Sequence, residues 1–486
     1  MEINISGDEY LKSLPKEFKD RMKKLLGDEW ENFEYSYMKE SCRGLRINSL
    51  KKGVLKEKHG EILKKAGIDY VEKVEWADDG YYYDNTSYPG KHPYHEAGLY
   101  YIQEPSAMSA AALLRPEPGD LVLDLCAAPG GKSTQLASYM GQEGLLISNE
   151  IHPERCKILS RNTERMGIAN AVITNEDSSL LAEKFPEFFD KILIDAPCSG
   201  EGMFRKNPQA IEEWSVDNIR LCAKRQAEIL DNGAAMLKRG GVMVYSTCTF
   251  SREENEETIE AFIKRHRDFD IEKQLRLFPH KHKGEGHFVA ALKKSSTGFC
   301  NISEAEYQKI DNINYRKEFS GNNCKKGQRN KNTERKPDKK QIEALREFTS
   351  KTLSANMEQY ILSGHLILFG GRLYRLPEAT PSLNGLKVLR AGLCIGEFKK
   401  ERFEPSHALA LFLGKDDVKS SEDISLTDVR LEKYLRGEAI ETDMSKGTAL
   451  IKGWCLVCAD GYSIGWGKAA GEQLKNHYPK GLRKNS

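Results

Sequence analysis

Asp124-Leu-Cys-Ala-Ala-Pro-Gly-Gly-Lys-Ser-Thr134 is the stretch of sequence that decides the fold. A short apolar run at 121–125 leads into it, as a buried strand would. The small residues that follow let the backbone turn tightly and approach a bound molecule where a helix begins. From residue 121 onward, short apolar runs alternate with amphipathic stretches, the pattern of a doubly wound α/β sheet. The sequence therefore predicts an α/β fold whose first loop holds a nucleotide-like ligand.

The predicted sheet consists of short, buried strands. Their apolar runs are residues 121–125, 145–148, 171–174, 191–194, 241–246 and 287–292. Helical periodicity between these runs is clearest at 216–237 and 252–267. Ser251 and Glu254 have the spacing of a capping box, which predicts that the second of these helices begins directly after Ser251.

Three kinds of nucleotide site compete for the loop. A dinucleotide site needs G-x-G-x-x-G, whereas Gly130 and Gly131 are adjacent. A P-loop needs G-x-x-x-x-G-K-[ST]; Gly131-Lys-Ser133 supplies its end, but Cys126 stands where the first glycine is required. A methyl-donor site needs no phosphate cradle. S-adenosylmethionine is therefore the expected cofactor.

Acidic residues at the ends of the next strands suit that cofactor. Glu150 lies about twenty residues beyond the glycines, where a carboxylate can accept hydrogen bonds from ribose hydroxyls. Asp177 follows the third predicted strand in the same way. The expected cofactor-binding residues are Cys126, Ala127, Ala128, Pro129, Gly130, Gly131, Lys132, Glu150, Arg155, Asp177 and Asp195.

Two cysteines leave the predicted sheet at the C-terminal ends of strands. Cys198 lies in Asp195-Ala-Pro-Cys-Ser-Gly-Glu-Gly-Met-Phe-Arg-Lys206, and Cys248 lies in Tyr245-Ser-Thr-Cys-Thr-Phe-Ser251. Ligands bind at this edge of a doubly wound sheet, so we expect both thiols to face one pocket together with the cofactor loop. A redox pair is the alternative, but no close C-x-x-C spacing brackets either cysteine.

A thiol in such a pocket suits methylation of carbon 5 of cytosine. That carbon is too weak a nucleophile to attack a sulfonium methyl unless a thiolate first adds to carbon 6. After transfer, the carbon 5 proton is removed and the thiol is eliminated, a release that a second thiol can assist. Asp195 can hydrogen-bond the cytosine edge and stabilise charge as the adduct forms. Residue chemistry alone does not choose between the two cysteines.

The chain resembles the RsmB/RsmF (Sun-domain) family of RNA 5-methylcytidine methyltransferases. The motifs that carry the resemblance are DLCAAPGGKST, DAPCSGEGMFRK, YSTCTFS, Tyr101-Ile-Gln-Glu-Pro-Ser106 and Gly286-His-Phe-Val-Ala290, over roughly residues 95–295. The resemblance implies a class I methyltransferase core of Rossmann-like fold, with Cys248 as the nucleophile and Cys198 as the thiol that assists product release. In DNA cytosine methyltransferases the Pro-Cys cysteine attacks instead, which leaves a swapped assignment as the alternative. Lys132 is a further candidate catalytic residue.

Two stretches near the C-terminus resemble the PUA-like RNA-binding end found among the RsmF members of that family. They are Gly385-Leu-Lys-Val-Leu-Arg-Ala-Gly392 and Asn476-His-Tyr-Pro-Lys-Gly-Leu-Arg483. The resemblance implies an RNA partner, either ribosomal RNA or the small ribosomal subunit, and a 16S target near the decoding region.

The expected domain order follows from these resemblances and from shifts in composition. We expect an N-terminal α+β RNA-binding or family-specific domain (1–95), the methyltransferase domain (96–300), a basic linker (301–340), a small connecting domain (341–385) and a PUA-like β-rich domain (386–486). Residues 316–340 contain ten Lys/Arg against three acids, which marks the linker.

The composition excludes several classes of protein. With 486 residues, 39% hydrophobic and 30% charged, the chain fits a soluble protein of several domains. It contains no apolar run of about 18 residues, and its acidic N-terminus is unlike a secretory signal. Eleven cysteines, an odd number, favour reduced thiols. We expect a cytoplasmic monomer that binds no membrane.

No metal is expected. Cys455-Leu-Val-Cys458 has C-x-x-C spacing, but no second Cys/His pair lies nearby, and the segment is typical of a strand. His280-Lys-His-Lys283, together with His287, favours a phosphate-facing loop over a metal site because lysines alternate with the histidines. Two alternatives to a methyltransferase stay open: a P-loop-type nucleotide hydrolase and a non-catalytic RNA-binding ribosome assembly factor.

Overall fold

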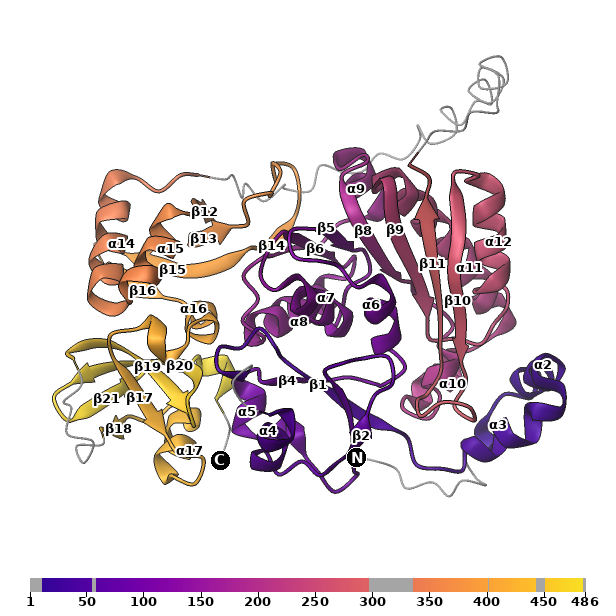
Figure 1. Ribbon diagram of the computed structural model, residues 1–486, viewed down its shortest axis with the longest axis horizontal. Helices are drawn as coiled ribbons and strands as arrows, with labels where there is room; N and C mark the ends of the chain where they lie inside the picture. The colour runs from indigo at the N-terminus through magenta and orange to yellow at the C-terminus, as the bar shows by residue number, and fades with distance from the viewer. Residues whose placement is uncertain (1–10, 55–57, 297–334, 401, 443–450, 484–486) are drawn as a thin grey trace, which may run out of the picture.

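The described part of the chain folds into four β-sheets with helices packed around them (Figure 1). The computed structural model describes residues 11–54, 58–296, 335–400, 402–442 and 451–483. In Figure 1 the central sheet has the C-terminal sheets, in orange and yellow, on its left and the indigo helices α2 and α3 at its lower right. The basic linker expected at 301–340 lies largely outside the described residues.

An eight-stranded sheet forms the centre of the molecule, in the order β10-β11-β9-β8-β5-β6-β7-β14. Its strands are β5 (Leu121–Asp124), β6 (Leu145–Asn149), β7 (Ala171–Thr174), β8 (Phe189–Asp195), β9 (Leu237–Thr247), β10 (Phe269–Leu277), β11 (His287–Lys294) and β14 (Val388–Ala391). β5 to β9 pair in parallel, whereas β10, β11 and β14 are antiparallel to their neighbours. The predicted α/β sheet is confirmed.

Helices cover both faces of this sheet. They are α6 (Met108–Leu114), α7 (Gly131–Met140), α8 (Pro153–Arg165), α9 (Ser178–Lys184), α11 (Val216–Met236) and α12 (Glu256–Arg265). The short helix α10 (Pro208–Glu213) packs instead in a separate hydrophobic cluster with residues of α2 and α3. Val122 and Leu123, successive residues of β5, belong to different hydrophobic clusters because successive side chains of a strand point to opposite faces. The parallel strands therefore carry apolar side chains on both faces, which is why the sequence predicts them well.

Two details of the central sheet differ from the prediction. β10 was not predicted because it is an edge strand, and its side chains between the two buried ends are exposed or half-buried. The predicted capping box is wrong, since α12 begins at Glu256. Glu254 contributes only its backbone N–H to Ser251 Oγ, at 3.4 Å, while its carboxylate is buried and bound by another segment.

The N-terminal part forms a smaller sheet in the order β2-β3-β1-β4. Its strands and the helices near it are β1 (Arg43–Ile47), β2 (Tyr70–Lys73), β3 (Gly80–Tyr83), β4 (Tyr100–Ile102), α2 (Lys16–Leu26), α3 (Trp30–Ser36), α4 (His59–Lys65) and α5 (Pro93–Glu96). Because β4 pairs with β1, this unit extends beyond the expected boundary at residue 95.

The C-terminal part contains two further sheets. The first, β12-β13-β15-β16, comprises β12 (His365–Phe369), β13 (Arg372–Leu376), β15 (Leu393–Lys399) and β16 (Arg402–Pro405), with α14 (Lys339–Thr352), α15 (Ala355–Ser363) and α16 (His407–Phe412). The second, β17-β19-β20-β21-β18, comprises β17 (Ser421–Ile424), β18 (Ile440–Glu441), β19 (Gly453–Ala459), β20 (Tyr462–Ala470) and β21 (Gln473–Asn476), with α17 (Val429–Arg436). The boundary expected after residue 385 falls inside the first of these sheets.

The first and last parts of the chain touch. Lys51 is buried, and its Nζ donates to Ser463 Oγ at 3.3 Å and to the Leu411 carbonyl. The rings of Tyr94 and Tyr462 meet edge to face, with centroids 5.5 Å apart. Among the helices that the structure describes, none is long and apolar enough to cross a membrane.

Candidate active site

The two predicted thiols lie together at the C-terminal edge of the central sheet. The Sγ atoms of Cys198, which follows β8, and Cys248, which follows β9, are 3.3 Å apart, and both cysteines are free. The loop after Cys198 is held against Cys248 because the Gly202 N–H donates to the Cys248 carbonyl at 2.8 Å. A Cβ at Gly202 would lie 3.0 Å from that carbonyl oxygen, so only glycine allows this approach.

A buried carboxylate, that of Glu254, links the segments that follow Cys198 and Cys248, which we call the thiol loops. Glu254 accepts hydrogen bonds from the Ser199 N–H at 2.9 Å, from Gln226 Nε2 at 3.0 Å and from Ser199 Oγ. Ser199 Oγ also lies 2.8 Å from Thr249 Oγ1. Burial raises the pKa of Glu254 to about 7. Ser199 and Thr249, the residues that directly follow the two cysteines, are thus held in place by hydrogen bonds that lead to Glu254.

A second buried carboxylate holds the same loops further along. Glu201 accepts from Thr249 Oγ1 and the Phe250 N–H, both at 2.9 Å, and from Trp214 Nε1 at 3.0 Å. Burial raises the pKa of Glu201. Sequence reasoning missed both Glu201 and Glu254, although Glu201 lies within the quoted cysteine motif.

Asp195, at the end of β8, lies at the centre of a charged cluster beside the thiols. Its Oδ2 accepts from Lys132 Nζ at 2.8 Å, and its Oδ1 accepts from Ser246 Oγ at 2.8 Å. Burial favours the protonated acid, but the charge of Lys132 outweighs it and holds the pKa of Asp195 below its ordinary value. Asp195 is therefore an anion near neutral pH. The structure brings Lys132, expected in the cofactor loop, to this carboxylate.

His287 completes the cluster; it opens β11, which confirms the strand predicted at 287–292 and excludes this residue from a phosphate-facing loop. It is 3% exposed at the start of β11, and its Nε2 lies 3.7 Å from Asp195 Oδ1. Burial lowers the pKa of His287 to about 4, so the imidazole is neutral near pH 7. Among the described residues nothing hydrogen-bonds this Nε2. His287 is buried because β11 is an inner strand of the central sheet, between β10 and β9.

The cofactor loop runs from β5 into α7. Gly130 is the N-cap of α7 and has φ +112°, a conformation that favours glycine. Arg46, buried in β1, fixes the start of the helix by donating from Nη2 to the Gly131 carbonyl at 2.8 Å. Asp124 Oδ2 accepts from Ser133 Oγ at 2.6 Å, whereas Asp124 Oδ1 is buried without a donor among the described residues.

The predicted acids occupy the ends of the next two strands. Glu150, 3% exposed, accepts the His152 N–H on Oε1 at 2.9 Å, and its Oε2 lies 3.6 Å from Arg155 Nη1. Arg155 Nη2 in turn donates to the Ala128 carbonyl of the loop at 2.8 Å. Asp177 is exposed and caps α9, since its Oδ1 accepts from the Ser179 N–H at 2.9 Å.

This set of groups fits S-adenosylmethionine better than a nucleoside triphosphate. Asp124 Oδ1 is an orphaned acceptor, and the carboxylate of Glu150 suits hydroxyl donors. The carboxylates of Glu150 and Asp195 near the loop disfavour the phosphates of ATP, whereas burial raises the pKa of Asp124 to about 7. Among the described residues no group of His, Cys, Asp and Glu is arranged to hold a metal ion.

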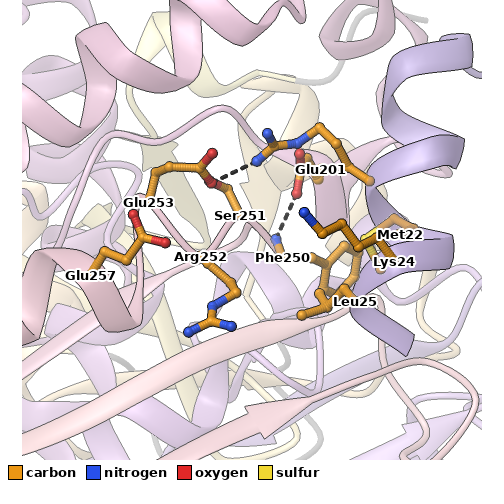
Figure 2. Close-up of a pocket in the computed structure, with 10 residues that line it drawn as sticks. Met22, Lys24, Leu25, Glu201, Phe250, Ser251, Arg252, Glu253 and Glu257 are labelled. Atoms are coloured by element: carbon orange, nitrogen blue, oxygen red, sulfur yellow. Dashed lines mark hydrogen bonds and ion pairs between the residues drawn. The ribbon is translucent and has the colours of Figure 1, made fainter. Parts of the chain in front are cut away.

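A cavity of about 410 Å³ lies behind the thiol loops, between α2 and the segment after Cys248 (Figure 2). Figure 2 shows Met22, Lys24 and Leu25 of α2 facing Phe250 to Glu253. Arg21 joins the two walls by an ion pair with Glu253 of 2.6 Å. Neither cysteine lines this cavity, although Glu201 does.

Models of four consecutive domains match the chain. They are the N-terminal domain of 16S rRNA methyltransferase RsmF (residues 14–105), 16S rRNA methyltransferase RsmB/F (111–293), the RsmF rRNA methyltransferase first C-terminal domain (347–413) and the methyltransferase RsmF PUA domain (421–484). The last two matches divide the C-terminal part as its two sheets do.

Whole-length relatives show the same similarity. Ribosomal RNA small subunit methyltransferase F of Vibrio cholerae is 30% identical and spans 97% of this chain and 98% of its own. The protein of that name from Shewanella oneidensis is 30% identical and spans 91% of each.

Solved structures resemble about three fifths of the chain. A methyltransferase homolog protein from Pyrococcus horikoshii is 30% identical, covers 60% of this chain and 100% of its own, and has a TM-score of 0.52. NSun6 from Pyrococcus horikoshii with SFG, at 23% identity, has the same coverage and TM-score, a likeness of fold alone.

Proposed function

We propose, because this chain belongs to the 16S rRNA methyltransferase RsmB/F family, that it methylates carbon 5 of a cytidine in small-subunit ribosomal RNA through a covalent cysteine adduct. The observation that carries the proposal is the distance of 3.3 Å between the Sγ atoms of Cys198 and Cys248, beside the anionic Asp195. Two thiols within reach of one ring atom suit a reaction in which one adds to the ring and the other assists its departure.

S-adenosylmethionine, when bound, supplies an electrophilic methyl group. Glu150 would accept hydrogen bonds from its ribose hydroxyls, and the backbone of 126–131 would line its methionine part. Asp177 is proposed as a further contact, through the oxygen that does not cap α9. Arg155 keeps the loop and Glu150 together by contacting both.

Asp195 provides a reason for the choice of cytosine. As an anion it can accept a hydrogen bond from the exocyclic amino group of cytosine, whereas it would repel the carbonyl oxygen that uracil carries at that position. Lys132 keeps the carboxylate ionised, because their contact of 2.8 Å offsets the cost of burial. In this reading Lys132 is a positioning residue.

The thiols take the roles that the family resemblance implies. Cys248 Sγ adds to carbon 6 of the cytosine, which makes carbon 5 nucleophilic. Once carbon 5 carries the methyl group it loses its proton, the bond between Cys248 Sγ and carbon 6 breaks, and Cys198 assists this elimination. Glu254 and Glu201 support both thiol loops and do not touch the ring.

The test is methyl transfer from labelled S-adenosylmethionine to small-subunit ribosomal RNA that lacks 5-methylcytidine, followed by bisulfite sequencing. We expect label in the RNA and at least one cytidine that resists deamination. Label at a cytidine that stays sensitive to bisulfite would place the methyl group on another atom and refute the proposal. Absence of transfer would favour a binding-only assembly factor, and tighter binding of ATP than of S-adenosylmethionine would favour a hydrolase.

A further inference from the structure

A second cavity, of about 240 Å³, lies where the first C-terminal domain meets the methyltransferase sheet. One wall is a single face of α8, and the other is formed by β13 and β14. Its lining residues are Lys157, Ser160, Arg161, Glu164, Arg372, Tyr374, Leu389 and Arg390. We call this cavity the basic cavity.

The charge of the basic cavity is strongly positive. Four cationic side chains line it against one carboxylate, that of Glu164. The cavity beside α2 differs, since three carboxylates balance its three cations. A multiply contacted anion is therefore stabilised in the basic cavity and not in the other.

Arg390 shows that the pairing in the basic cavity is incomplete. Its side chain is 4% exposed, and Nη2 pairs with Glu164. Among the described residues its Nε and Nη1 have no acceptor. A buried guanidinium with free donors is costly unless an anion completes its contacts, and a phosphate matches its fork geometry.

Two further cations are available at the mouth of the cavity. Arg161 and Arg372 are exposed, and neither is within ion-pair distance of a carboxylate in the described part of the chain, although, against the effect of burial, the charges of Glu164 and Glu397 help to raise the pKa of Arg372. Lys157 is less available because it pairs with Glu154 at 2.6 Å. Arg161 comes from α8 and Arg372 from β13, so an anion between them would contact both domains.

The location of the basic cavity favours a long ligand. The thiols follow β8 and β9, while the cavity adjoins β14, at the other end of the strand order. With strands about 4.8 Å apart, the two places are on the order of 20 Å from each other. A polynucleotide spans such a distance and a mononucleotide does not.

We propose that the basic cavity binds a backbone phosphate of the RNA substrate at a distance from the methylated cytidine. The inference rests on the proposed function, since it takes RNA as the substrate. Arg161 and Arg372 contact the phosphate directly, and Arg390 beneath them supplies a fixed charge. A phosphate contact does not distinguish one base from another; it increases the affinity for RNA and fixes the orientation of the RNA on the protein.

The test compares the double variant Arg161→Gln/Arg372→Gln with the double variant Lys264→Gln/Arg267→Gln. The second pair is also exposed and removes the same charge, but it lies at or just after the C-terminal end of α12, directly before β10 in the chain, and β10 is the edge strand opposite β14. RNA affinity is measured by fluorescence anisotropy with an unmodified small-subunit rRNA fragment at several salt concentrations. S-adenosylmethionine affinity and thermal unfolding are measured alongside.

We expect the Arg161/Arg372 variant to bind this RNA about fivefold or more weakly, and the slope of log affinity against log salt to fall by about 1. A short oligonucleotide that carries the cytidine but cannot reach the basic cavity is expected to bind wild type and variant equally. S-adenosylmethionine affinity and thermal unfolding are expected to stay unchanged, and the Lys264/Arg267 variant is expected to match wild type.

Equal RNA affinity and equal salt slopes for the Arg161/Arg372 variant and wild type would overturn the inference. Loss of inorganic phosphate binding with intact RNA binding would also overturn it and assign the cavity to a small anion. Failure of the proposed function is distinguishable, because it appears as absent methyl transfer in the wild-type protein. Lys157→Gln serves as a second variant and is expected to weaken RNA binding less, since Lys157 already has a partner.

Discussion

Cys198 Sγ lies 3.3 Å from Cys248 Sγ although the two residues are fifty positions apart in the chain. Two contacts join their loops directly, between Ser199 Oγ and Thr249 Oγ1 at 2.8 Å and between the Gly202 N–H and the Cys248 carbonyl at 2.8 Å. Neither thiol can therefore move far without the other. This arrangement makes the effects of single substitutions at the two positions informative.

Replacing the two thiols one at a time is expected to give opposite products. Cys248→Ala removes the proposed nucleophile, so we expect neither methyl transfer nor a covalent complex. Cys198→Ala leaves addition intact and slows elimination, so we expect a protein–RNA adduct that survives denaturing electrophoresis. Cys222→Ala, which removes a buried thiol of α11, is the control and is expected to behave as wild type. The reverse pattern, with adduct only in Cys248→Ala, would invert the roles.

Removing the cation beside Asp195 is expected to change the pH dependence of the reaction. In the wild type, burial favours the neutral acid but Lys132 outweighs it, so the pKa of Asp195 is low and the carboxylate is lost only in strong acid. In Lys132→Gln this pKa rises, so methyl transfer is expected to decline at a higher pH as the medium is acidified. Rates at saturating S-adenosylmethionine between pH 5 and 8 measure this shift.

Lys132→Arg is the matched control for that experiment. It keeps the positive charge, so its pH profile is expected to stay close to that of the wild type. Superimposable profiles for Lys132→Gln and the wild type would show that Lys132 does not keep Asp195 ionised.

Two substitutions at Asp177 separate its capping role from its proposed cofactor role. Asp177→Ala removes the N-cap of α9 and is expected to cost about 1 kcal/mol in the free energy of unfolding. Asp177→Ser retains a capping oxygen and is expected to cost little. If the carboxylate also contacts the cofactor, calorimetry will show about tenfold weaker S-adenosylmethionine binding in both variants. Wild-type affinity in Asp177→Ser would reduce Asp177 to a helix cap.

Glu254 is expected to make stability fall as pH rises. Its pKa is about 7 in the folded protein because of burial, against an ordinary value of 4.5 for a glutamate in water. Between these values the folded state binds more protons than the unfolded state, so the free energy of unfolding decreases with pH by at most about 1.4 kcal/mol per unit. The stabilisation by protonated Glu254 is complete below pH 4.5 and is lost as the pH rises above about 7.

Glu254→Gln tests this dependence. A glutamine amide reproduces the protonated acid, since its oxygen can accept from the Ser199 N–H while its NH₂ donates to Ser199 Oγ. Chemical denaturation of the variant is expected to show little change in unfolding free energy between pH 5 and 8, and greater stability than the wild type at pH 8. Parallel pH curves for the two proteins would contradict the buried charge at Glu254.

The central sheet was predictable because its parallel strands are apolar on both faces. β10 and β14 were not, for different reasons. β10 is an exposed edge strand with few apolar residues, so its sequence lacks the signal of burial. β14 joins β7 from more than two hundred residues away, and no local pattern encodes that pairing.

The candidate site likewise contains residues that local sequence predicts and residues that only the fold brings together. Cys198, Cys248 and Asp195 were predictable because each lies within four residues after the end of an apolar run. Glu254 was mistaken for a capping residue, since its partner Ser199 is 55 positions away and only the fold brings them together. His287 opens the predicted strand at 287–292, but its contact with Asp195 depends on strands far apart in the sequence. The catalytic and cofactor roles of these residues stay predictions.

β14 has a consequence for how the protein can be divided. This strand pairs with β7 through Val388, Arg390 and Ala391, and the Lys387 carbonyl extends the contact by accepting from the Asn175 N–H at 2.9 Å. A fragment that ended at residue 300 would leave the backbone groups of β7 open at a bare sheet margin, which invites self-association. The pairing of β7 with β14 thus joins the methyltransferase domain to the C-terminal part of the chain. Any recombination of these domains during evolution would have to preserve this strand pair.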